Sequence, residues 1–261
     1  MTAAAIPALE DEVRHARELF VTLTPQEWHA ASGCEGWRVQ DVVQHMAAVF
    51  QQIAEPSSID VGQSGKAEQA NDVPVAARRD WTVQEVLDAY DEWSVKGVAA
   101  LAALQEPPMS EVEAPIADLG THPLHLLGNA IAFDHYCHLR HDVGTVVDRA
   151  AALPQDAGTV AVTLEWMLAG LPQMCADALA VAPQRSVNLV FEGVGGGDYV
   201  LAPGPDGWTV NPGSDPDAPT VRSSVHDFVS WGTKRSDWRL SVTGDVDDDE
   251  VAVVLDAINI I

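Results

Sequence analysis

Apolar residues recur every three or four positions along much of the first half of the chain, a spacing that places them on one face of an α-helix. This spacing predicts long amphipathic helices over residues 8–23, 39–53, 83–104 and 124–143. The second of them has the clearest apolar stripe, formed by Val39, Val42, Val43, Met46, Val49, Phe50 and Ile53. Four such helices with one long crossover are typical of a helix bundle.

Two stretches of this half lack helical spacing. Residues 55–80 contain Pro, Ser, Gly and Gln in place of periodic apolar residues, and residues 105–120 contain three prolines. We predict a long connection and a loop there. Thr24, followed by Pro25, predicts the N-cap of a short helical turn, and Thr82 predicts the cap of the helix that follows it.

The pattern changes after Gly144. A helix is expected over residues 153–179, and the short β-branched runs that follow, separated by Gly- and Pro-rich turns, predict strands. The predicted strands are 186–191, 198–201, 207–210, 218–222 and 238–243, with helices over 224–233 and 247–258. We therefore expect a two-domain α+β protein, with a four-helix bundle over residues 1–148 and a smaller α+β domain over residues 149–261.

The helix over residues 124–143 carries polar side chains within its apolar stripe. Asp134, His138 and His141 lie on the same side, at spacings i, i+4 and i+7. A buried carboxylate must be paired, protonated or bound to a metal, because burying it alone is strongly unfavourable. The Asp134–His138 pair is therefore either a hydrogen bond of the core or a pair of divalent-metal ligands. His45, at the margin of the 39–53 stripe, is either a half-buried packing residue or a third ligand.

Composition and charge exclude several classes of function. A net charge of −25 disfavours binding to nucleic-acid phosphates and to anionic membrane surfaces. No apolar run reaches the ~20 residues of a membrane span. The N-terminus lacks a basic region followed by an apolar core, so we predict no signal peptide and a cytoplasmic protein.

The three cysteines are Cys34, Cys137 and Cys175, far apart and without a CxxC pair. This predicts neither a disulfide framework nor a thiolate zinc site. Cys34 lies in a loop beside Glu35, and no histidine partner is identifiable for it from the sequence. We therefore expect Cys34 to anchor the loop rather than to act as a nucleophile.

Segments in both halves of the chain resemble the mycothiol-dependent maleylpyruvate isomerase family, which belongs to the DinB-like superfamily of metal-binding four-helix bundles. Leu23–Trp28 and Cys34–His45 are similar to its N-terminal motif, and Phe133–Asp142 to its second motif, in which an acidic residue stands four before a histidine. The tail resembles the family's C-terminal α+β domain in Trp231–Gly232, Val242–Asp245 and Val251–Ile258.

The resemblance implies a set of metal ligands. Carried over position by position, the family's three ligands fall on His45, Asp134 and His138. The family's isomerase has Glu where this chain has Asp134, which is one methylene shorter, so His141 is kept as a reserve ligand. Three protein ligands leave a position open, as in catalytic zinc sites. Zinc is therefore the expected metal.

The resemblance also implies the chemistry. Mycothiol would be the thiol cosubstrate, activated at the metal for addition to a small electrophilic substrate. The thiol leaves again in an isomerase and stays attached in an S-transferase, and both outcomes are open. Candidates for binding the substrate are Asn71, Arg78 and Arg79, which lie in the predicted connection. The two arginines would bind a carboxylate group of the substrate. The alternatives are a non-catalytic metal-binding DinB-like protein and an interaction protein with a structural Asp–His pair.

Overall fold

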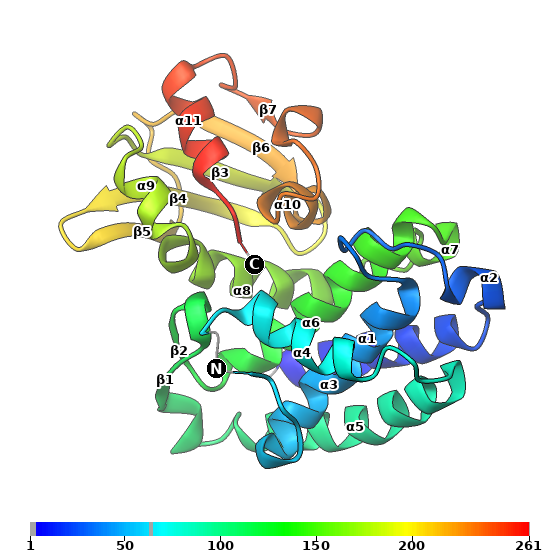
Figure 1. Cartoon of the computed structure of the whole chain (residues 1–261). Coiled ribbons are helices and arrows are strands. Elements are labelled where there is room, and N and C mark those ends of the chain that lie inside the picture. Colours follow the sequence, from blue (N-terminus) through cyan, green and yellow to red (C-terminus); the bar gives the residue numbers. More distant parts are fainter. Residues whose placement is uncertain (1–3, 63–64, 261) are drawn as a thin grey trace. The chain divides into compact units, whose positions relative to one another are not determined.

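The computed structural model describes residues 4–62 and 65–260 (Figure 1). The chain divides into two compact units, residues 1–154 and 155–261, whereas the sequence placed the boundary after residue 148. The first unit is mostly helical and the second contains a five-stranded sheet, which confirms the predicted two-domain α+β class. Within the described part of the chain, no helix has both the length and the apolar character that crossing a membrane requires.

The long helices of the first unit agree with the hydrophobic pattern. They are α1 (Ala5–Phe20), α3 (Val39–Ala54), α5 (Val83–Ala103) and α6 (Leu126–Cys137), accompanied by the short helices α2 (Pro25–Trp28) and α7 (Asp148–Ala151). Helices α2 and α5 begin with capping boxes, in which the Thr24 and Thr82 hydroxyls accept from the backbone N–H of the glutamate three residues later.

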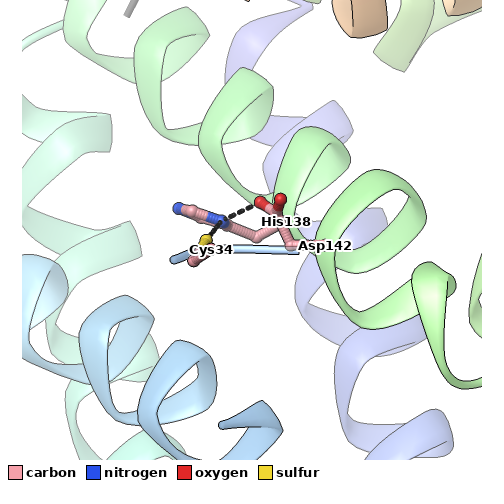
Figure 2. Close-up of side chains that lie close together, drawn as sticks. All are labelled: Cys34, His138 and Asp142. Atoms are coloured by element: carbon pink, nitrogen blue, oxygen red, sulfur yellow. Dashed lines mark hydrogen bonds and ion pairs between the residues drawn. The ribbon is translucent and has the colours of Figure 1, made fainter. Parts of the chain in front are cut away.

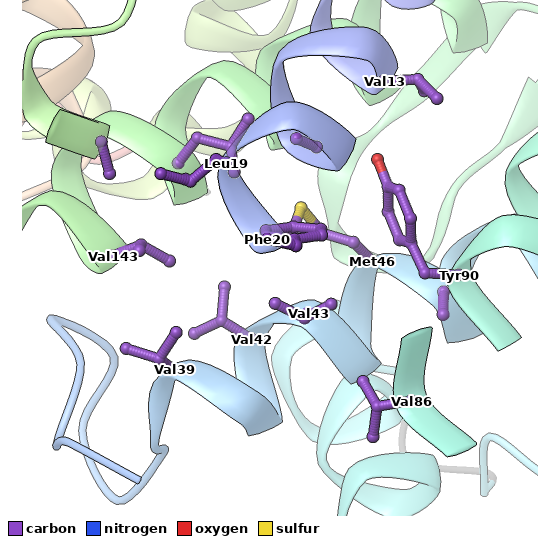
Figure 3. Packing of buried hydrophobic residues seen from close by; sticks show 14 of the residues in the cluster. Val13, Leu19, Phe20, Val39, Val42, Val43, Met46, Val86, Tyr90 and Val143 are labelled. Atoms are coloured by element: carbon purple, nitrogen blue, oxygen red, sulfur yellow. The ribbon is translucent and has the colours of Figure 1, made fainter. Parts of the chain in front are cut away.

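The core of this unit lies where α1, α3 and α5 meet (Figure 3). Phe20, Met46 and Tyr90 point into it and are at most 1% exposed. Burying a side chain of this size stabilises the fold by about 1.5–3 kcal/mol. Helix α3 packs against α5 with one face, and this packing fixes the direction in which its polar residue His45 points.

The two stretches predicted to lack secondary structure do contain some. Residues 55–80 include a 3₁₀ turn (Pro56–Ser58) and helix α4 (Ala67–Ala77), while residues 63–64 lie outside the described part. Helix α4 buries only Pro74 and Val75, so it has almost no apolar stripe to detect.

The prediction of a purely helical first unit is also wrong. Strands β1 (Glu113–Pro115) and β2 (Thr121–Pro123) form an antiparallel pair there, flanked by 3₁₀ turns at Met109–Glu111 and Ala117–Leu119. Each strand has only three residues and ends in proline, which is too short for an alternating pattern to appear.

The helix predicted over residues 124–143 changes form along its length. The α-helix α6 ends at Cys137, and residues His138–Asp142 form one π-helical turn, called the π-turn below. A 3₁₀ turn, Val143–Thr145, follows it. Such turns bond residue i to i+5 and occur frequently at functional sites. The apolar pattern does not distinguish a single π-turn from a continuing α-helix.

The second unit is a mixed sheet with helices. The strands are β3 (Val187–Glu192), β4 (Gly197–Gly204), β5 (Gly207–Pro212), β6 (Thr220–Ser224) and β7 (Thr243–Gly244), in the order β5-β4-β3-β6-β7. Only the β3–β6 pair is parallel among these strands. The helices are α8 (Ala157–Met174), α9 (Ala176–Ala180), α10 (Val225–Gly232) and α11 (Asp249–Ala257).

The strand predicted over residues 238–243 is wrong in most of its length. Residues Trp238–Leu240 form a 3₁₀ turn, and only Thr243 and Gly244 pair with β6. The side chain of Asp237 caps the turn by accepting from the Arg239 backbone N–H, and the Trp238 indole donates to Asp256 at 2.7 Å. These side-chain bonds stabilise a turn where the apolar spacing indicated a strand.

Candidate metal centre

Three side chains from two helices meet inside the helical unit. His45 comes from α3, Asp134 from α6, and His138 opens the π-turn that continues α6. The Asp134 Oδ1 atom lies 3.1 Å from His45 Nε2 and 3.4 Å from His138 Nε2. His45 is 2% exposed, and the Asp134 and His138 side chains are 20% and 12% exposed. The structure thus brings together the three residues that the family resemblance indicated.

Charge and burial set the protonation of this cluster. Burial lowers the pKa of His45. Burial alone would raise the pKa of Asp134, but the charges of His138 and His45 hold it well below its ordinary value. Burial opposes the charged form of His138 too, yet Asp134 and Cys34 raise the pKa of His138 well above its ordinary value. The metal-free cluster therefore holds an ionised Asp134 beside a protonated His138.

Two buried atoms of the cluster lack hydrogen-bond partners among the described residues, namely His45 Nδ1 and Asp134 Oδ2. The His135 Nδ1 atom lies 3.5 Å from Asp134 Oδ2, but its hydrogen bond is to the Ile131 carbonyl at 3.0 Å. Buried carboxylate oxygens are rarely left unpaired. The unpaired oxygen therefore distinguishes this cluster from a fully satisfied core hydrogen bond.

The other ring nitrogen of His138 has a carboxylate partner of its own. His138 Nδ1 lies 2.7 Å from Asp142 Oδ2, at the far end of the π-turn (Figure 2). The Asp142 side chain is 1% exposed. Asp142 was not among the predicted site residues, although the spacing Asp134, His138, Asp142 repeats the same four-residue interval.

Cys34 also lies against His138, a histidine partner that could not be identified from the sequence. Its Sγ atom is 3.7 Å from His138 Nδ1 (Figure 2). The Ser32 hydroxyl accepts from the Cys34 backbone N–H at 3.2 Å and donates to the Trp37 carbonyl at 2.9 Å. These bonds hold the loop in a compact turn. The contact could not be read from the sequence because 104 residues separate Cys34 from His138.

His141, the reserve ligand, points elsewhere. Its ring lies 6.4 Å from that of Tyr136, and it belongs to neither group of described residues whose metal-binding atoms lie within 4.8 Å of one another. The π-turn explains this, because a turn bonded from i to i+5 is wider than an α-turn. A residue three positions after His138 therefore no longer shares its face.

The predicted substrate-binding residues lie in and after α4. Arg78 donates to the Gln51 side chain and stacks over the Trp81 ring at 4.8 Å, while its Nη1 is buried with no hydrogen-bond partner among the described residues. Burial lowers the pKa of Arg78. Arg79 donates to the Gly36 carbonyl at 2.9 Å. Asn71 is half-buried in α4. The hydrogen bonds of Arg78 and Arg79 go to Gln51 and Gly36, and not to the His45–Asp134–His138 cluster.

This protein is a two-domain α+β protein. Its helical unit carries an inward-facing set of two imidazoles and a carboxylate. The family model described as "Mycothiol maleylpyruvate isomerase N-terminal domain" matches residues 9–138. The chain belongs to the mycothiol maleylpyruvate isomerase family, which is named for an enzyme.

The fold agrees with this membership. The chain is similar to a crystal structure of the mycothiol-dependent maleylpyruvate isomerase, with a TM-score of 0.57, 13% sequence identity, and coverage of 95% of this chain and 94% of that one. A histidine-to-alanine mutant of that isomerase matches with the same identity and coverage and a TM-score of 0.55. No curated protein matches the chain in sequence.

Proposed function

We propose that this chain is a metal-dependent enzyme that uses mycothiol, a low-molecular-weight thiol, on a small electrophilic substrate. Isomerisation is the favoured reaction because the family is named for an isomerase. S-transfer, in which the thiol stays attached to the product, is the second candidate. It uses the same activated thiol and differs only in the fate of the adduct.

The observation that carries the proposal is the spacing of the His45, Asp134 and His138 donor atoms. Zinc takes nitrogen and oxygen ligands at about 2.1 Å, so two ligands of a tetrahedral ion lie about 3.4 Å apart. The distances of 3.1 Å and 3.4 Å from Asp134 Oδ1 to the two Nε2 atoms fit this spacing. The unpaired Asp134 Oδ2 also fits a site that accepts a cation. Asp134 reaches both histidines despite its shorter side chain.

In this proposal His45, Asp134 and His138 would hold a divalent metal, most plainly zinc. When bound, such an ion favours the thiolate form of a coordinated thiol at neutral pH. The chain's own residues prepare the site for it. Asp134 supplies the anionic ligand, and Asp142 holds the Nδ1 edge of His138 so that Nε2 faces Asp134. The Trp37 ring packs against the His45 ring at a tilt, with the ring centres 5.2 Å apart.

Arg78 remains the strongest candidate among the proposed substrate-binding residues. The N–H groups on its buried Nη1 have no acceptor among the described residues, and an arginine binds a carboxylate with well-defined geometry. Arg79 and Asn71 stay in the proposal as weaker candidates, since Arg79 donates to the Gly36 carbonyl and lies 3.7 Å from Asp41.

The test incubates the zinc-loaded full chain with mycothiol and maleylpyruvate, and follows both the substrate and the free thiol. We expect isomerised product at constant free thiol, whereas a transferase consumes one thiol for each product formed. His45→Ala, prepared in the same way, is the control and should show neither change. If the loaded wild type gives no thiol-dependent reaction with maleylpyruvate or with a panel of small electrophiles, the proposal fails.

A further inference from the structure

The π-turn places a buried carboxylate, that of Asp142, against Nδ1 of the proposed metal ligand His138. Asp142 Oδ2 lies 2.7 Å from His138 Nδ1, and the Asp142 side chain is 1% exposed. In a wider turn bonded from i to i+5, residues four apart stay on one side while residues three apart do not. The π-turn therefore selects Asp142, and not His141, as the neighbour of His138.

The hydrogen bond to Asp142 determines which nitrogen of His138 is available to a cation. A neutral imidazole carries one N–H, and its other nitrogen has a free lone pair. Asp142 accepts the Nδ1–H, so when His138 gives up its other proton the lone pair is left on Nε2, which lies 3.4 Å from Asp134 Oδ1. A carboxylate in this position fixes the tautomer and the ring orientation of a metal-binding histidine, and raises its basicity.

Asp142 is itself held by contacts from two sides. The Gly33 backbone N–H donates to the Asp142 carbonyl at 3.0 Å. A Cβ at Gly33 would lie 2.8 Å from Asp142 Oδ1 and 3.0 Å from its Cα, so the loop approaches this closely only because residue 33 is glycine. Within the π-turn, Arg140 makes two hydrogen bonds to the buried Glu12 of α1. These contacts with the Gly33 loop and with α1 fix the position of Asp142.

A rival interpretation makes the same residues a second metal site. Cys34, His138 and Asp142 offer sulfur, nitrogen and oxygen donors within 4.8 Å of one another. The distance of 2.7 Å between His138 Nδ1 and Asp142 Oδ2 decides against it. Two ligands of a tetrahedral zinc ion lie about 3.4 Å apart, whereas 2.7 Å is a normal length for a charge-assisted hydrogen bond.

We propose that Asp142 is a positioning residue of the metal centre, which orients His138 through Nδ1 so that Nε2 binds the cation. The inference rests on the proposed function in one respect only, that His138 is a metal ligand. Cys34 packs against the same ring edge and takes no part in metal binding.

The test compares zinc affinities of the full-length wild type, Asp142→Asn and Asp142→Ala, measured by competition with a chromophoric chelator. Removing an outer carboxylate of this kind weakens metal binding about 10–100-fold. We expect a loss in that range for alanine and a smaller one for asparagine, whose amide oxygen still accepts from Nδ1–H. Asp256→Asn is the matched control, because Asp256 accepts from the Trp238 indole at 2.7 Å and bonds none of the proposed ligands. Its affinity should equal that of the wild type.

Two spectroscopic signatures separate positioning from a merely structural role. In the zinc-loaded wild type, ring ¹⁵N spectra should show the proton of His138 on Nδ1, with a shift that changes in Asp142→Asn. With Co²⁺ in place of zinc, the wild type should lack the intense near-ultraviolet band of a cysteine–cobalt bond. Such a band, if it disappears in Cys34→Ser, would place the metal on the Cys34 side and overturn the proposal.

Equal zinc affinity in the wild type and in a folded Asp142→Ala also overturns the inference, and leaves the proposed function standing. If the alanine variant does not fold, the asparagine variant and its ring ¹⁵N spectrum decide the question. A wild type that binds no zinc at all overturns both the inference and the proposed function. The two failures are therefore distinguishable.

Discussion

The buried ion pair between Glu12 and Arg140 tests how the π-turn is held in place. The Arg140 Nη1 and Nη2 atoms lie 2.7 and 2.9 Å from the two carboxylate oxygens of Glu12, and both side chains are fully buried. Glu12→Gln keeps the size of the side chain but removes its charge, so the guanidinium stays buried without a counter-ion. Breaking a buried pair in this way costs about 3–5 kcal/mol.

The assay is thermal and urea unfolding followed by circular dichroism. For a chain of this size, a loss of 3–5 kcal/mol lowers the melting temperature by about 6–20 °C. The effect also depends on pH. Burial raises the pKa of Glu12, but hydrogen bonds from His15 and Arg140 and the charge of Arg140 lower it overall, below the ordinary value of 4.5. The ionised Glu12 therefore stabilises the fold above pH 4.5, and this stabilisation is lost as the pH falls further. The free energies of unfolding of the wild type and the variant should then converge.

Two further variants serve as controls for this experiment. Arg14→Gln breaks an exposed pair with Asp11, in which the side chains are 52% and 49% exposed, and should leave the melting temperature unchanged within error. The double variant Glu12→Met/Arg140→Leu removes both charges and should recover most of the lost stability. A Glu12→Gln protein as stable as the Arg14→Gln control would show that the buried ion pair does not stabilise the fold.

Three other outcomes are expected. Asp134→Asn should lose zinc by elemental analysis, whereas Asp134→Glu should retain more; equal zinc in the wild type and in Asp134→Asn would count against the assignment. Zinc affinity should rise with pH in a competition assay, because Asp134 and Cys34 raise the pKa of His138 and the ion must displace its proton; a flat profile would contradict this. Gly97→Ala should destabilise the protein by about 1–3 kcal/mol in urea, since its Cβ would lie 2.3 Å from a ring atom of Phe50, whereas Gly158→Ala, with nothing within 4 Å, should not.

The parts of the fold that the sequence predicted are those in which one face of an element is buried and the other is not. Helix α3 buries Val39, Val42, Val43 and Met46 completely, so its spacing is unmistakable. Helix α4 was not predicted because it buries only two residues, and β1 and β2 were not predicted because each has only three residues. The 3₁₀ turn at Trp238 replaced a predicted strand because side-chain bonds to Asp237 and Asp256 decide its local conformation.

Part of the candidate site could likewise be predicted from the sequence, and part could not. The Asp134–His138 pair was visible because both residues lie on one helix at an interval of four. His45 could be joined to them only through the family resemblance, because the meeting of α3 with α6 is a tertiary contact. The contact of Cys34 with His138 was not foreseen for the same reason. The π-turn has no signature in the apolar pattern, so the exchange of His141 for Asp142 as the neighbour of His138 could not be foreseen.

The zinc content of the full chain tests the central claim most directly. The protein is stripped of metal, reloaded with zinc, dialysed, and analysed for zinc and protein in the same sample. We expect about one zinc ion per chain in the wild type. We expect none in His45→Ala or His138→Ala, with the far-ultraviolet circular dichroism of both variants unchanged. Equal zinc in the wild type and the two histidine variants, or a wild type that retains none, would show that these residues do not form a metal centre.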